Sequence, residues 1–184
     1  MAGRGERKTA RIIGIDPGLA RMGWGIVDHQ GQRLALVACG CIETQPAGPV
    51  SERLARIYQE LRALLAAHQP QEMAVEELFF HRNTTTAFHV GQARGVALLA
   101  AAHAGMPVAE YTPMQVKQAV VGYGKAEKRQ VQEMVRVLLG LSERPRPDDT
   151  ADALAVAITH AHASAYRDRV VRPGPAPGTG GEVR

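Results

Sequence analysis

Two acidic side chains lie inside apolar stretches of the sequence, where a charge is costly. Asp152 interrupts the run ADALAVAI over 151–158, and Glu76 comes late in the stretch MAVEELF over 73–79. An ionised carboxylate that leaves water is destabilised unless a positive group pairs with it. Neither acid has a lysine or arginine at a local pairing distance in the sequence. The sequence therefore predicts that both acids meet a cation supplied from elsewhere.

Two more acids extend this pattern. Asp16 ends the apolar run RIIGID before a Pro-Gly pair, and Asp149 lies three residues before Asp152, on the same face of a predicted helix. Each has a second interpretation. Asp16 suits a turn, and Asp149 with its neighbour Asp148 suits a helix start, where acids cap exposed amide groups. Asp16 is a candidate for the same site because its strand ends at the carboxyl edge of the sheet, and Asp149 because it shares a helix face with Asp152.

Several carboxylates in one place would repel each other and raise each other's pKa values unless a cation holds them. A hard divalent ion, Mg²⁺ with Mn²⁺ as its substitute, takes oxygen ligands. Four carboxylates from two strands and one helix suit two such ions about 4 Å apart, which stabilise the attacking and leaving oxygens of a phosphoryl displacement. The acids therefore predict metal-dependent hydrolysis of a phosphodiester.

The elements that must position these acids follow from the apolar spacing. Three strands in quick succession over 11–16, 22–28 and 33–44 are expected to pair antiparallel. A helix then leads to a strand over 72–80, which a helical crossover makes parallel to one of the first group. Further helices are expected over about 84–103, 112–119, 126–139 and 148–165, with a short strand over 107–111. The predicted fold class is α/β, a mixed five-stranded sheet with helices on both faces, in which Asp16 and Glu76 converge at one sheet edge.

Composition limits the class of protein. The 184 residues suit one domain over 11–171, between a flexible basic tail over 1–10 and a disordered tail rich in proline and glycine over 172–184. No apolar run reaches the length of a membrane span, and the start lacks the core of a signal peptide, so we expect a cytoplasmic protein and no membrane partner. The formal net charge of +4 favours a polyanionic partner without proving one.

Four other side chains that could bind a metal or react receive simpler interpretations. Cys39 and Cys41 are two apart in a predicted strand, and we expect small apolar fillers rather than a disulfide. His160 and His162 are separated by about 200° around a helix and are poorly placed to share an ion. We expect both histidines to be polar surface residues or partners of the helix end.

Five blocks of sequence in order carry a resemblance to a known family: GIDPG, AVEELFF, GQARGVALLAA, QVKQAVVGYGKAEKRQVQEMV and DDTADALAVAITHAH. Together, over about residues 11–165, the chain resembles the RuvC family, bacterial Holliday junction resolvases with the ribonuclease H fold. The resemblance implies paired symmetric nicks in opposed strands of a four-way DNA junction, in recombination and repair, with two Mg²⁺ ions in each active site. The family's acidic tetrad falls on Asp16, Glu76, Asp149 and Asp152, with Asp148 as an extra neighbouring acid.

The resemblance also implies contacts with DNA and with other proteins. Lys117 and Lys128 match lysines near the scissile phosphate, Arg82 falls in a DNA-facing loop, and Phe79 matches an aromatic that inserts at opened bases. A homodimer is implied, and two identical sites would suit a twofold-symmetric junction. Gly91 and Gly95, four apart, would let another helix approach, although core packing explains them equally well. The branch-migration proteins RuvA and RuvB are the further partners that the resemblance implies.

Three alternatives remain. An actin-like ATPase or sugar kinase also begins with a Gly-x-Asp-x-Gly loop, but it needs two similar halves, and this chain has one. A non-catalytic junction-binding protein would keep the basic residues without needing four acids. Another nuclease of the ribonuclease H fold would use the same acids on a different nucleic acid.

Overall fold

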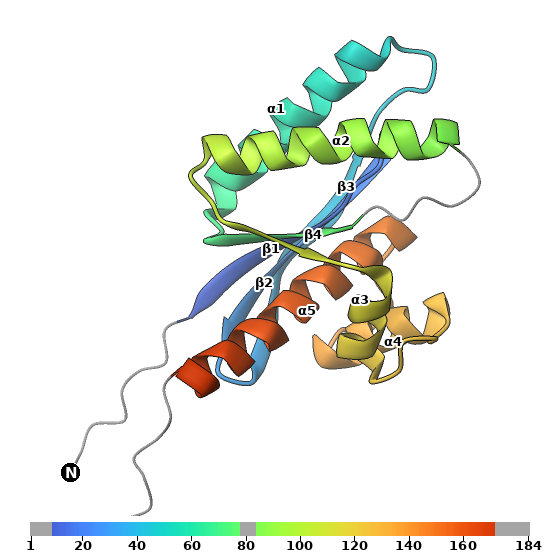
Figure 1. The fold of residues 1–184 in the computed structure, drawn as a ribbon. Helices are drawn as coiled ribbons and strands as arrows, with labels where there is room; N and C mark the ends of the chain where they lie inside the picture. Colours follow the sequence, from blue (N-terminus) through green and yellow to red (C-terminus); the bar gives the residue numbers. More distant parts are fainter. Residues whose placement is uncertain (1–8, 78–83, 172–184) are drawn as a thin grey trace, which may run out of the picture.

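The computed structural model describes residues 9–77 and 84–171, and in these ranges the chain forms one sheet covered by helices on both faces (Figure 1). The strand order is β3-β2-β1-β4-β5. Within the described ranges, no helix combines the length and the apolar character that a membrane crossing requires.

The first three strands form the predicted antiparallel meander. They are β1 (Ala10–Asp16), β2 (Arg21–Gln30) and β3 (Arg33–Glu43). β2 pairs antiparallel with both of its neighbours, and Asp16 stands opposite Gly23. Gly31, with a φ of 69°, supplies the left-handed conformation that the tight turn between β2 and β3 requires.

The helical crossover makes the next pairing parallel, as predicted. Helix α1 (Val50–His68) leads to β4 (Glu72–Glu76), which pairs parallel with β1. Helix α2 (Thr84–His103) leads to β5 (Val108–Tyr111), which pairs parallel with β4. Because Ile15 is aligned with Val75, the following residues Asp16 and Glu76 end adjacent strands at the same edge of the sheet.

The helices form two layers (Figure 1). Helices α1 and α2 cover one face over a core that includes Ile13, Ile57 and Ala97. The other face carries α3 (Pro113–Val121), α4 (Lys128–Leu138) and α5 (Asp148–Val171) over a second core. Helix α5 runs six residues further than predicted, and α4 begins at Lys128 because Glu127 forms a capping box with Gln130.

Glycines in the sheet determine how closely α5 approaches it. A Cβ atom on Gly23 would overlap the backbone oxygen of Asp149, and one on Gly14 would overlap the backbone oxygen of Ala153. The backbone of α5 therefore lies directly on the backbone of β1 and β2. This contact places the first turns of α5 beside the end of β1.

Candidate active site

The structure brings the four predicted acids to one place. Asp16 and Glu76 end β1 and β4, while Asp149 and Asp152 lie in the first turns of α5. The pKa of Asp16 is raised to about 8, mainly by burial and further by the charges of Glu76, Asp152 and Asp149. The pKa of Asp16 is therefore affected by all three other acids. The four carboxylates converge as the sequence led us to expect.

Burial also raises the pKa values of the neighbouring acids Glu76 and Asp152. The pKa of Glu76 is raised to about 7, because burial and the charge of Asp152 raise it by more than Lys128 and Lys117 lower it. Burial likewise raises the pKa of Asp152, and Lys128 opposes this change. Four full negative charges are thus poorly tolerated here without additional positive charge.

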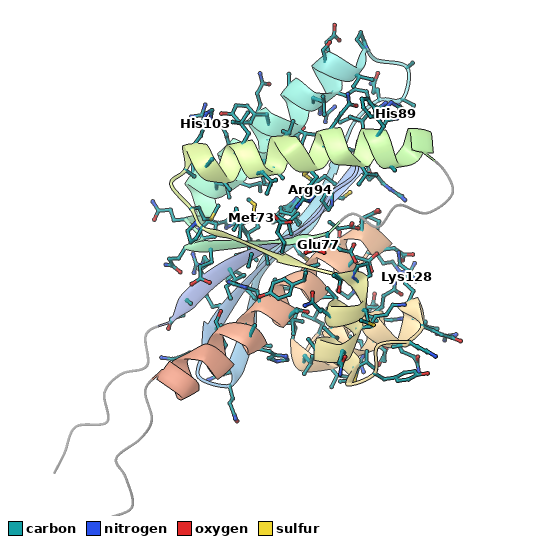
Figure 2. The ribbon with its side chains drawn as sticks, viewed as in Figure 1. Met73, Glu77, His89, Arg94, His103 and Lys128 are labelled. Atoms are coloured by element: carbon teal, nitrogen blue, oxygen red, sulfur yellow. The ribbon has the colours of Figure 1, made fainter. Side chains whose placement is uncertain are left out.

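Lys128 supplies part of that charge from the start of α4. Its ammonium nitrogen lies 2.7 Å from Asp152 Oδ2 and 3.7 Å from Asp148 Oδ2. Burial lowers the pKa of Lys128, but the hydrogen bond with Asp152 and the charges of Asp152 and Asp148 outweigh this effect and raise it. Figure 2 shows Lys128 beside the first turns of α5. The partner of Asp152, absent from its local sequence, therefore comes from another helix.

Arg21 is a second cation at the cluster, and it was not among the residues predicted from the sequence. Its Nε atom lies 3.0 Å from Asp149 Oδ2, yet this oxygen is buried and has no hydrogen-bond partner within the described residues. The two charges therefore pair without the alignment of a hydrogen bond. A basic residue that opens the strand after the Asp-Pro-Gly turn was the available signal, because the meander returns it to the edge where Asp16 ends.

The donor set fits a hard divalent cation. All four acids offer carboxylate oxygens, which Mg²⁺ and Mn²⁺ prefer, and one oxygen of Asp149 is a buried acceptor with no hydrogen-bond donor among the residues that the structure describes. In the described ranges, no three histidine, cysteine, aspartate or glutamate side chains stand close enough to hold one ion together. The acids are near enough to perturb each other but do not form a closed ligand shell, and Lys128 lies on one of them.

The remaining predicted residues differ in how far the structure places them. Lys117 lies on α3, near enough for its charge to act on Glu76. Phe79 and Arg82 lie outside the described residues. Cys39 and Cys41 are free and partly buried, in agreement with the prediction that they form no disulfide.

The prediction for His160 was wrong. Its side chain is only 3% exposed, and it contacts Tyr111 and Glu72 between α5 and the sheet. The helical spacing alone did not reveal this position because α5 is buried over most of its circumference. His162 is exposed, as expected.

The chain matches known proteins over most of its length. The family model described as crossover junction endodeoxyribonuclease RuvC matches residues 12–160. The protein of that name from Desulfitobacterium hafniense is 62% identical over 151 residues, which cover 82% of this chain and 92% of the relative.

Solved structures give the same result. Thermus thermophilus RuvC is 44% identical, with a TM-score of 0.80 over 85% of this chain and 96% of that one. T. thermophilus RuvC in complex with a Holliday junction substrate is 43% identical, with a TM-score of 0.82 over 86% of this chain and 96% of the other. The mixed five-stranded sheet with helices on both faces is accordingly the ribonuclease H-like fold that was predicted. The chain therefore belongs to the RuvC family of crossover junction endodeoxyribonucleases.

Proposed function

We propose that this protein resolves Holliday junctions by paired symmetric nicks in opposed strands, in homologous recombination and DNA repair. The observation that carries the proposal is the convergence of four carboxylates at one sheet edge in a member of the RuvC family. A relative solved with a Holliday junction, aligned over 86% of this chain, supports the choice of substrate.

Asp16, Glu76, Asp149 and Asp152 are the residues that would hold two Mg²⁺ ions, with Mn²⁺ as a substitute. When bound, such ions supply an activated water and stabilise the leaving oxygen of the phosphodiester. Asp16 has the central position because the charges of the other three acids all act on it. The chain contributes a partly buried, oxygen-lined edge in which these acids are already gathered.

Basic residues around the acids would position the DNA. Lys117 lies on α3 and Lys128 on α4, and the charge of each lowers the pKa of Glu76. Both therefore lie near the place where a scissile phosphate would bind. Lys117 has no ion pair with an acid of the described ranges, which leaves its charge available to a phosphate. Arg82 and Phe79 are proposed DNA contacts on the family resemblance alone.

The exposed face of α2 supports a homodimer. Phe88 and Leu99 are 67% and 48% exposed, and Gly95 lies between them on the same helical stripe. A Cβ atom on Gly95 would have no neighbour within 4 Å. An apolar stripe with a glycine at its centre suits a second copy of the same helix, and two copies would place one acid cluster on each side of a twofold junction. RuvA and RuvB remain proposed partners on the family resemblance.

The test compares cleavage of a mobile four-way junction and of an RNA–DNA hybrid, each with Mg²⁺ and with EDTA. Junction cleavage that needs Mg²⁺ supports the proposal. Asp16→Asn is expected to bind the junction without cutting it, whereas Asp28→Asn, which alters an acid paired with Arg11 in the sheet, should still cut. Cleavage of the hybrid alone would favour another nuclease of this fold, and cleavage after complete chelation would refute the metal centre.

A further inference from the structure

Helix α5 and strand β4 run antiparallel, and each carries two polar side chains at matched spacing. Glu76 ends β4 beside Asp152, whose charge raises its pKa, and Glu72 begins β4 in contact with His160. Glu72 and Glu76 are four strand residues apart, about 13 Å. Asp152 and His160 are eight helical residues apart, about 12 Å. The two pairs therefore connect β4 to α5 at two places. Glu76 and Asp152 meet at the acid cluster, and Glu72 and His160 meet near the start of β4.

His160 connects α5 to the sheet through both of its ring nitrogens. Its Nε2 atom contacts Glu72 on β4, and its Nδ1 atom lies 2.7 Å from the hydroxyl oxygen of Tyr111 on β5. Because a carboxylate only accepts hydrogen bonds, Nε2–H donates to Glu72, and in the neutral ring Nδ1 accepts from the Tyr111 hydroxyl. One buried side chain thus joins α5 to two neighbouring strands.

Tyr111 extends this connection to the acid cluster. It stands opposite Glu76 in the pairing of β4 with β5, and its carbonyl oxygen accepts a hydrogen bond of 2.8 Å from the amide of Glu77. The backbone that Tyr111 holds is therefore the end of β4 that presents Glu76. The side chain of Tyr111 meanwhile contacts His160 on the helix that presents Asp152.

Directional contacts matter here because the other buried side chains of α5 are mostly apolar. Ala153, Leu154, Ala157 and Ile158 are fully buried, and hydrophobic attraction between such groups is non-directional, so hydrogen bonds add the directional part of the fit. Near the acids, Thr150 donates to the carbonyl oxygen of Gly40 on β3 at 3.1 Å. His160 supplies the corresponding polar anchor at the other end, on β4 and β5.

We propose that His160, held by Glu72 and Tyr111, is a positioning residue that sets the register of α5 against β4 and thereby the separation of Asp152 from Glu76. This inference rests on the metal centre proposed above. His160 does not touch the reacting atoms; it acts through the helix that carries two of the four acids.

The experiment measures Mn²⁺ binding by calorimetry without DNA, together with the melting temperature. His160→Leu is expected to weaken Mn²⁺ binding about tenfold, since loss of supporting contacts around a metal site has effects of this size. His160→Gln, whose amide still donates toward Glu72, should recover part of that affinity. His162→Leu, on the exposed side of the same helix, should bind Mn²⁺ like the wild type.

A second control separates register from general stability. Ile57→Val removes one buried methylene-sized group from the core on the opposite face of the sheet and lowers stability without touching α5. Unchanged Mn²⁺ affinity in Ile57→Val beside a reduced affinity in His160→Leu supports positioning. A His160→Leu protein that melts earlier but binds Mn²⁺ as tightly as the wild type overturns the inference alone. A wild-type protein that binds no Mn²⁺ overturns the proposed metal centre and this inference with it.

Discussion

A divalent cation bound at the proposed site would compete with Lys128 for the carboxylate of Asp152. The ammonium group lies 2.7 Å from Asp152 Oδ2, so an ion that uses Asp152 as a ligand must displace it. The released lysine can then meet a DNA phosphate. Metal binding and DNA binding should therefore strengthen each other through this one side chain, and such coupling is reciprocal.

We predict that Ca²⁺, used to load the site without cleavage, increases the affinity of the wild-type protein for the junction. In Lys128→Gln, the factor by which Ca²⁺ increases this affinity should be about fivefold smaller. Fluorescence anisotropy with and without Ca²⁺ measures the effect. Lys117→Gln is the matched control, since the charge of Lys117 lowers the pKa of Glu76 but Lys117 forms no ion pair with an acid of the described ranges. It should weaken binding equally under both conditions. Full retention of the Ca²⁺ effect in Lys128→Gln would contradict the exchange.

Single residues were predictable from the sequence where a charge stood in an apolar stretch. That rule found Asp152 and Glu76, and the position of Asp16 at the carboxyl end of an apolar strand made it a third candidate. It did not find Arg21 or the buried contacts of His160, because their partners are distant in sequence and neither residue stands out from its local neighbours. Lys128 was assigned to DNA on resemblance, and the structure adds its contact with Asp152.

At the scale of elements, the contact of α5 with β1 and β2 decides where two of the acids lie. We predict that Gly23→Ala destabilises the protein by about 2 kcal/mol, the usual cost of overpacking, because its Cβ would overlap the backbone oxygen of Asp149. The displaced helix start should also reduce Mn²⁺ affinity. Chemical denaturation and calorimetry measure the two effects.

Gly48→Ala is the control for Gly23→Ala, since its Cβ would meet its nearest neighbour at 3.5 Å, an ordinary contact. It should leave both stability and Mn²⁺ affinity near their wild-type values. If Gly23→Ala retained the stability and metal affinity of the wild type, the close approach of α5 would not control the site.

The elements themselves were more predictable than their contacts. The crossover rule predicted that β4 lies parallel to one of the first three strands, which the structure shows to be β1, and apolar spacing gave α2 at its observed bounds. The close contact of the α5 backbone with β1 and β2 was not predicted. A glycine inside a strand indicates a bulge, a bend or a close backbone approach, and only the position of the second element shows which of these applies.

At the scale of the whole molecule, bound metal ions would add to the net positive charge that favours DNA binding. The chain carries a formal net charge of +4, and two divalent ions would raise it to about +8 in each subunit. A dimer would double the basic surface that meets the four negatively charged arms of a junction. Assembly therefore bears on both the pairing of the nicks and the strength of DNA binding.

We predict that Gly95→Leu converts a dimer into a monomer without loss of folding. In the single chain the new side chain would project into open space, and replacing a helical glycine should stabilise α2 by about 1 kcal/mol. Between two copies of α2, the same side chain would hold the helices apart. Light scattering after gel filtration should give twice the 19.8 kDa chain mass for the wild type and for Ala66→Leu on the exposed surface of α1, and the single mass for Gly95→Leu. A Gly95→Leu protein that remains dimeric would place the interface on another face.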